Sequence, residues 1–375
     1  MKIGIVCFPS FGGSGALATE LGKKLAKEGD QVHFISYDIP FRLIGPWRKN
    51  IYFHRVDVAD YPLFQNNPVN ALFLANKIVE VAKQERLNIL HAHYSVPFSM
   101  AIHIAQSVIG KDKIKTITTL HGTDVTLFGE DEKIAYVNKY AVKKSDAVTA
   151  VCKFLAEEAK KVFDLKKVDV IYNFVDVRKE PIKKSKELRE IFAKENEKII
   201  IHISNFREVK RIQDVLEIFK KIVKKIPSKL LLVGDGPEQP LAQRLASKFQ
   251  IIDRVHFMGV QNNVARLLSI ADILLLPSEK EAFNLTALES MTCGVPVIST
   301  KIGGMPEMIE NGKEGYLLEV GDVKNMAEKS ILLLSDEKLY KEISRNGRTK
   351  VREDFSESKI IPQYRALYKK IIKSA

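Results

Sequence analysis

Two basic side chains, Arg207 and Lys210, follow a short apolar run that ends at Ser204. They are three residues apart, so one turn of helix would aim both of them at the same point. Arginine offers a planar fork of donors and lysine a compact charge, and the combination suits a diphosphate. The sequence therefore predicts an anion site at the end of a strand. A basic turn on the surface is the competing interpretation.

Two glutamates bracket the start of a predicted helix further along the chain. Glu281 falls in a loop after the apolar run 273–276, and Glu289 falls about one turn inside the following helix. The backbone N–H groups of residues 284–286 open that helix and carry the positive end of its dipole. Carboxylates can hold sugar hydroxyls while such a backbone holds phosphate, so this context, rather than the spacing alone, favours a ligand site.

A glycine-rich segment, residues 12–15, follows the first apolar run and opens an amphipathic stretch. Glycines in that position let backbone N–H groups approach an anion. Three interpretations stay open: a tight turn, an anionic or sugar substrate, and a nicotinamide cofactor. The last arises because Gly13, Gly15 and Ala18 also fit the dinucleotide spacing, with Asp38 as a ribose acid.

Histidines stand at the ends of two further strands. His91 and His93 alternate onto one face of a strand. A zinc pair there is conceivable, but zinc needs three or four ligands and no cluster of Cys or His lies nearby in sequence. Polar contacts at the strand end are the other interpretation. Tyr94 follows directly and is better placed to touch a ligand.

The segment 121–124 follows the run 115–120 in the same strand-end position. Gly122 lets the chain turn sharply. We expect this turn to present the His121 imidazole and the Asp124 carboxylate to a ligand, and a neutral polar cap is the alternative.

These residues are positioned by short β-branched runs that alternate with amphipathic stretches, a pattern typical of parallel sheets covered by helices. The alternation stops over residues 171–196 and restarts at Lys198. We therefore expect an α/β fold with two tandem, doubly wound, Rossmann-like domains, residues 1–170 and 171–355, and a tail, 356–375, that packs back on the first. Ligands bind beyond the carboxyl ends of such strands, so an interdomain cleft is expected.

The composition of the chain also limits the classes of protein to which it can belong. The 375 residues are 45% hydrophobic and 28% charged, which is typical of a globular chain. Apolar runs are far shorter than the ~18 residues that span a bilayer, and no secretory leader is evident, so we expect a cytoplasmic protein. The odd cysteines, Cys7, Cys152 and Cys293, indicate reduced thiols. The net charge of +13 comes as separated lysine pairs, which favours solvated helix faces over nucleic acid, with an anionic lipid surface left open.

Taken together, these motifs resemble the retaining glycosyltransferases of family 4, which have the two-Rossmann GT-B architecture. The resemblance covers the whole chain and is carried by residues 12–15, 205–210, 234–238 and the pair Glu281 and Glu289. The chain is similar in particular to the branch that glycosylates L-malate in the bacillithiol pathway, through residues 9–15, 40–43, 91–94, 118–124, 171–174 and 204–207. The family usually has glycine where this chain has Asn284. Asparagine also tolerates unusual backbone angles, so we expect the loop to survive.

The resemblance implies transfer of N-acetylglucosamine from UDP-GlcNAc to the hydroxyl of L-malate, with retention and without a cofactor. No metal is expected, since the chain has no Asp-x-Asp pair. Arg207 and Lys210 would stabilise the leaving diphosphate, helped by backbone N–H groups at Gly13 and Gly15. The resemblance further implies that Glu289 binds the uridine ribose and that His121 contacts the sugar's 6-hydroxyl. The sugar itself would be bound by Glu281 and by the backbone of Asn284, Leu285 and Thr286. Malate would be bound by Ser14, Tyr94, Thr119 and Asn173.

Three other functions remain to be weighed. A related transferase could act on a membrane lipid and dock through a basic amphipathic helix such as residues 153–167. A nicotinamide-dependent oxidoreductase would leave the cations and glutamates of the second half unused. A catalytically silent sugar-nucleotide-binding protein would bind without forming product. A homodimer is compatible with each of them.

Overall fold

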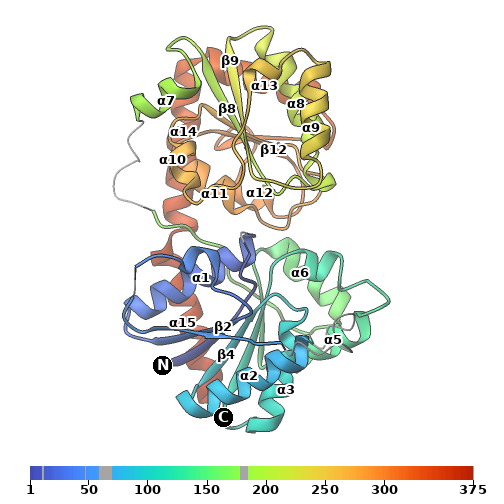
Figure 1. Ribbon diagram of the computed structural model, residues 1–375, viewed down its shortest axis with the longest axis vertical. Coiled ribbons are helices and arrows are strands. Elements are labelled where there is room, and N and C mark those ends of the chain that lie inside the picture. Colours follow the sequence, from blue (N-terminus) through green and yellow to red (C-terminus); the bar gives the residue numbers. More distant parts are fainter. Residues whose placement is uncertain (11, 47, 59–69, 178–184, 375) are drawn as a thin grey trace. The chain divides into compact units, whose positions relative to one another are not determined.

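The computed structural model describes residues 1–10, 12–46, 48–58, 70–177 and 185–374. The chain divides into two compact units (Figure 1). The first comprises Met1–Asn173 and Ser358–Ala375, and the second comprises Phe174–Glu357. Phe11 of the motif 9–15 and residues 178–184 of the second predicted domain lie outside the described residues.

The first unit is built on a seven-stranded parallel sheet with the order β3-β2-β1-β4-β5-β6-β7. The strand order reverses at β1 and β4, which is the switch point where doubly wound sheets bind ligands. Its strands are β1 (Lys2–Val6), β2 (Gln31–Ser36), β3 (Ile51–Arg55), β4 (Ile89–His93), β5 (Lys115–Leu120), β6 (Ala147–Ala150) and β7 (Asp169–Val170). Its helices are α1 (Gly13–Lys27), α2 (Asn70–Glu85), α3 (Phe98–Ile109), α4 (Thr123–Thr126), α5 (Ala135–Lys144), α6 (Lys153–Phe163) and α15 (Glu357–Lys373), with a 3-10 turn η1 (Phe41–Leu43).

Strand β4 shows how the two faces of this sheet are covered. Leu90 and Ala92 are fully buried in the apolar cluster that α2 and α3 build. His91 and His93 alternate onto the opposite face. There the His91 ring contacts Tyr364 and Tyr368 of α15. The last helix of the chain, red in Figure 1, therefore completes the core of the first unit.

The second unit is a six-stranded parallel sheet with the order β10-β9-β8-β11-β12-β13. Its switch point lies between β8 and β11. The strands are β8 (Lys198–Ile203), β9 (Ser228–Val233), β10 (Val255–Phe257), β11 (Ile273–Leu276), β12 (Val297–Thr300) and β13 (Gly315–Leu318). The helices are α7 (Lys186–Phe192), α8 (Ile212–Val223), α9 (Gln239–Lys248), α10 (Val264–Leu268), α11 (Leu285–Thr292), α12 (Met305–Met308), α13 (Val323–Ser335) and α14 (Glu337–Asp354), with 3-10 turns η3 (Glu208–Lys210) and η4 (Ile252–Arg254).

The predicted fold class, two doubly wound α/β sheets in tandem, is confirmed by these topologies. Helices cover both faces of each sheet, so the residues of the central strands are almost all buried, whereas the edge strands β3, β7 and β10 are mostly half-buried or exposed. Among the described residues, no helix is long and apolar enough to cross a membrane.

Candidate active site

The glycine-rich segment opens α1 at the carboxyl end of β1. A Cβ on Gly15 would lie 2.6 Å from the carbonyl oxygen of Phe8 and 2.9 Å from that of Ser10, so only glycine lets the helix approach this strand end. A Cβ on Gly13 would meet nothing within 4 Å. No side chain of the described residues caps the helix, so the N–H groups of its first turn can receive an anion. Ser14 is half-buried in that turn.

The ends of β4 and β5 lie side by side and bring the predicted His121 and Tyr94 together. His93 Nδ1 and His121 Nε2 are 3.2 Å apart. The Tyr94 hydroxyl is hydrogen-bonded to that of Thr123 at the start of α4. Tyr94 itself has a φ of +98°, which the sharp turn after β4 imposes on a side chain that ordinarily avoids this region.

Asp124 does not face a ligand. Its side chain is fully buried, and its carboxylate accepts hydrogen bonds from the backbone N–H groups of His121, Gly122 and Ser95. Burial raises the pKa of this carboxyl to about 6, against the lowering effect of those bonds. The expectation that Asp124 is presented to a substrate is therefore wrong. Its carboxylate holds the turn that Gly122 makes at a φ of +147°.

The Thr119 hydroxyl is engaged by the buried side chain of His91. His91 Nδ1 is 2.7 Å from the Tyr368 hydroxyl, and His91 Nε2 is 2.7 Å from the Thr119 hydroxyl. Thr119 also contacts Thr149 at 2.6 Å, and all of these side chains are fully buried. The Thr119 hydroxyl, which the resemblance assigns to the acceptor, is thus buried and bonded to His91 on the face of the sheet that α15 covers.

Asn173, the other interior polar residue in the predicted acceptor set, is only 4% exposed. Its side-chain oxygen is buried and has no hydrogen-bond partner among the described residues. Within the described ranges, no group of three or more His, Cys, Asp or Glu side chains could hold a metal ion.

In the second unit the two predicted cations differ in their surroundings. Arg207 is exposed and is the N-cap residue that precedes η3. Lys210 Nζ lies 2.5 Å from Glu281 Oε1, and the two side chains are 15% and 9% exposed. Phe206 anchors the turn in the core, where it is fully buried. The ion pair links the loop after β8 to the loop after β11.

Glu281 Oε1 is also 3.0 Å from Ser278 Oγ and 3.0 Å from Asn284 Nδ2. Asn284 is the N-cap of α11, and its side-chain oxygen accepts from the N–H of Ala287. Its φ of −100° is ordinary, so the tolerance of unusual backbone angles expected for this residue is not needed. This cap leaves the N–H groups of Leu285 and Thr286 without intrahelical partners. Glu289 is half-buried one turn further along.

Comparison with known proteins decides the family. A model of the glycosyltransferase family 4 matches residues 11–179, and one of the group 1 glycosyl transferases matches residues 183–350. The N-acetyl-alpha-D-glucosaminyl L-malate synthase of Bacillus anthracis is 46% identical over 375 residues, which is 100% of this chain and 98% of that protein. This chain belongs to glycosyltransferase family 4. The glycosyltransferase activity predicted from the motifs is thereby confirmed, and the oxidoreductase interpretation of the glycine segment is wrong.

Solved structures confirm the GT-B fold of this glycosyltransferase. A glycosyltransferase from Rickettsia africae is 22% identical, with a TM-score of 0.81, and covers 100% of this chain and 99% of its own. Anabaena Alr3699/HepE in complex with UDP-glucose is 19% identical, with a TM-score of 0.81 and 100% of both chains covered.

Sequence reasoning missed the loop after β12, which packs against the candidate site residue Glu281. A Cβ on Gly303, whose φ is +51°, would lie 1.6 Å from the carbonyl oxygen of Glu281. The N–H of Gly304 donates to the carbonyl of Ala282 at 2.9 Å, and the Thr300 hydroxyl donates to that of Ser278 at 2.5 Å. The pair of adjacent glycines, Gly303 and Gly304, shortly after an apolar run was the available signal.

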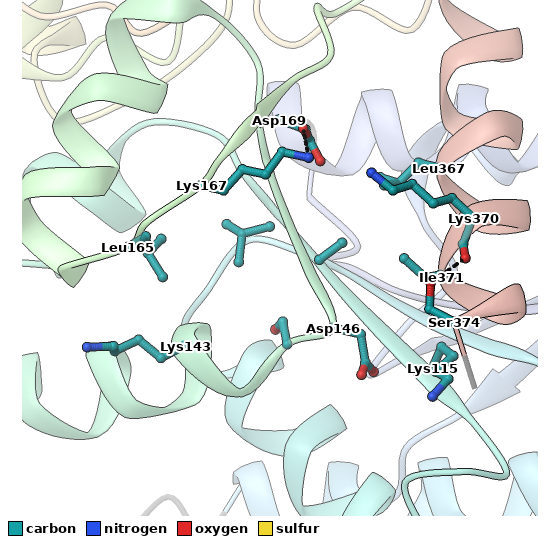
Figure 2. A pocket seen from close by; sticks show the side chains of 13 residues that line it. Lys115, Lys143, Asp146, Leu165, Lys167, Asp169, Leu367, Lys370, Ile371 and Ser374 are labelled. Atoms are coloured by element: carbon teal, nitrogen blue, oxygen red, sulfur yellow. Dashed lines mark hydrogen bonds and ion pairs between the residues drawn. The ribbon is translucent and has the colours of Figure 1, made fainter.

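The glycosyltransferase also has a cavity of about 330 Å³ at the other end of the first sheet (Figure 2). It is lined by Lys115, Ala147 and Asp169, the first residues of β5, β6 and β7, and by the last turns of α15. Figure 2 shows Lys167 paired with Asp169, 2.8 Å apart. None of the predicted site residues lines this cavity, and ligands of such sheets bind at the opposite, carboxyl end.

Proposed function

We propose that this glycosyltransferase transfers N-acetylglucosamine from UDP-GlcNAc to the hydroxyl of L-malate and retains the anomeric configuration. The full-length identity of 46% to the Bacillus anthracis L-malate synthase carries the proposal. The contacts around Glu281 support a sugar donor, because a carboxylate, two capped-helix N–H groups and two cations occur together in the loops after β8 and β11.

The second unit would bind the donor. Glu289 would hold the uridine ribose, while Glu281 and the N–H groups of Leu285 and Thr286 would hold the sugar. Arg207 and Lys210 would stabilise the charge that develops on the diphosphate as the glycosidic bond breaks, and no metal would be required. Lys210 already lies beside a carboxylate, which orients its ammonium before the donor arrives.

The first unit would bind the acceptor. Malate is a dianion, and Ser14, Tyr94 and Asn173 would make polar contacts with its carboxylates and hydroxyl. The N–H groups at the start of α1, including those of Gly13 and Gly15, would help Arg207 and Lys210 to stabilise the leaving diphosphate of the donor. His121 would contact the 6-hydroxyl of the transferred sugar.

Retention can proceed through a covalent intermediate on a carboxylate or through attack on the same face. Glu281 Oε1 has three donors within 3.0 Å, one of them an ammonium, and such contacts make it a poor nucleophile. We therefore favour same-face attack. The malate oxygen bonds to the anomeric carbon as the carbon–oxygen bond to UDP breaks, and the leaving phosphate takes the hydroxyl proton.

Mass spectrometry of the reaction products tests this function. Purified enzyme is incubated in EDTA with UDP-GlcNAc and, separately, L-malate, D-malate, L-lactate or glycerate. A glycosylated product with L-malate is expected, and proton NMR of its anomeric signal should show the α configuration. No product with any hydroxy acid, together with glycosylation of lipid in vesicles, would favour the membrane-lipid alternative instead.

A further inference from the structure

The imidazoles of His93 and His121 form a pair whose nitrogens are not equivalent. His93 Nδ1 is 3.2 Å from His121 Nε2. The other nitrogen of His93, Nε2, is buried and has no hydrogen-bond partner among the described residues. His121 is half-buried, and its other nitrogen, Nδ1, is not among the buried unpartnered side-chain atoms of that part of the chain.

One hydrogen occupies the line between the two rings. Burial lowers the pKa of His121 to about 3 and that of His93 well below its ordinary value, so both rings are neutral near pH 7. Each ring then carries a single hydrogen. If His121 donated it, His93 would carry its own hydrogen on Nε2 and bury an N–H without an acceptor. Such orphaned buried donors are rare in proteins. If His93 donates from Nδ1, its Nε2 is a bare nitrogen and no donor is orphaned.

We propose that His93 is a positioning residue that fixes the tautomer of His121. His93 Nδ1–H donates to His121 Nε2, so His121 carries its hydrogen on Nδ1 and presents a donor at its accessible side. The inference deepens the proposed function and rests on it for one step, the contact of His121 with the sugar. In that contact the sugar hydroxyl is the acceptor.

His91 keeps His93 in place for this task. The two ring centroids are 4.1 Å apart, and both His91 nitrogens are held, one by Tyr368 of α15 and one by Thr119 of β5. The His93 ring therefore packs against a neighbour that is fixed from two sides. In the described part of the chain, the ring of His93 has no hydrogen bond other than the one to His121.

Nitrogen NMR on histidine-labelled enzyme observes the tautomer directly, without substrate. The chain has 8 histidines, few enough for the ring signals to be assigned with single variants, including His121→Gln and His93→Asn. We expect His121 to show a protonated Nδ1 and a bare Nε2. A protonated Nε2 on His121 would overturn the proposal, whatever the enzyme's substrates are.

Kinetics then separate positioning from packing. An asparagine amide nitrogen can take the place of Nδ1, so His93→Asn keeps a donor to His121, whereas His93→Leu removes it. We expect His93→Leu to lower kcat/KM for UDP-GlcNAc roughly tenfold and His93→Asn to stay within about threefold of wild type. Equal losses in the two variants would refute a role for the donor.

The chain offers a matched control in the same sheet. His33 is fully buried, its Nδ1 is 3.0 Å from His54 Nε2, and its Nε2 also has no partner among the described residues. His33→Leu should lower the melting temperature about as much as His93→Leu but leave kcat/KM unchanged. A tenfold loss in this control as well would show that the effect comes from packing. If the wild type fails to use UDP-GlcNAc while NMR finds the expected tautomer, the proposed function fails and the hydrogen-bond assignment stands.

Discussion

At the scale of the residue, the ion pair of Lys210 and Glu281 gives the two predicted cations different tasks. Lys210 is mostly buried beside a carboxylate, and removing one partner of such a pair leaves the other charge uncompensated. Arg207 is exposed, so its side chain contributes little to the fold. Arg207 would therefore act through its positive charge alone, while Lys210 would supply positive charge and also stabilise the loop through its ion pair.

Replacing each cation by alanine should separate these tasks. Arg207→Ala and Lys210→Ala are each expected to lower kcat by ~10², because both remove charge from the developing diphosphate. Only Lys210→Ala should also lower the melting temperature, since it leaves the Glu281 carboxylate without its ion-pair partner. Lys221→Ala, an exposed lysine on α8, serves as the control and should change neither quantity. Turnover like wild type in Arg207→Ala and Lys210→Ala would remove this account of leaving-group stabilisation.

Single residues also show where sequence reasoning ends. The spacing of Arg207 and Lys210 was enough to predict a basic turn at a strand end. It could not show that Lys210 pairs with a glutamate 71 positions away. Asp124 illustrates the same limit, because a carboxylate after a strand can face a ligand or bind its own loop. Which of the two occurs depends on whether the backbone N–H of Ser95, just after the neighbouring strand, comes close enough to donate to the Asp124 carboxylate.

At the scale of the element, the loops after β11 and β12 support one another. Gly303 lies so close to the carbonyl of Glu281 that a side chain cannot be accommodated. The register that pairs Leu276 with Ser299 sets this approach. The adjacent glycines were visible in the sequence, but their importance follows from the neighbouring strand, which the periodicity of one segment does not reveal.

Gly303→Ala and Gly259→Ala form a matched pair of variants. Their φ values are +51° and +59°, so the backbone strain of an alanine, roughly 1 kcal/mol, is similar at both. A Cβ at Gly259 meets nothing within 4 Å, whereas at Gly303 it would displace the backbone of Glu281. Gly303→Ala should therefore reduce kcat/KM by more than tenfold, and Gly259→Ala should leave it near wild type. Equal activities in the two purified variants would show that Glu281 need not be held in this position.

At the scale of the whole molecule, the alternation of strands and helices was sufficient to predict two doubly wound sheets, because period and order along the chain determine which segments can pair. Histidine burial was not predictable in this way. Strand registers, and the packing of α15 on the first sheet, determine the surroundings of the buried histidines. These are His33, His91 and His121 in the first unit and His202 in the second. Their surroundings depend on segments far apart in the chain.

These buried histidines should make the protein acid-sensitive. Burial lowers the pKa of His91 and His121 to about 3 and that of His33 and His202 to about 4, from an ordinary value of 6.5. As pH falls below 6.5 the unfolded chain binds these protons and the folded chain does not. The free energy of unfolding therefore falls, by up to about 1.4 kcal/mol per pH unit for each histidine.

Asp124 acts in the opposite direction. Its pKa is raised to about 6, so between pH 6 and 4 the folded state holds a proton that the unfolded state releases, and stability rises as pH falls. The first unit contains three of these histidines, and also His93, whose pKa burial lowers well below its ordinary value, against this one carboxyl, so the net effect there is a loss of stability. Urea unfolding at pH 7.0, 5.5 and 4.5 should show the midpoint of the first unit falling more steeply than that of the second, and His33→Leu should flatten its slope. A midpoint that stays level or rises on acidification would mean that these histidines are protonated in the folded protein.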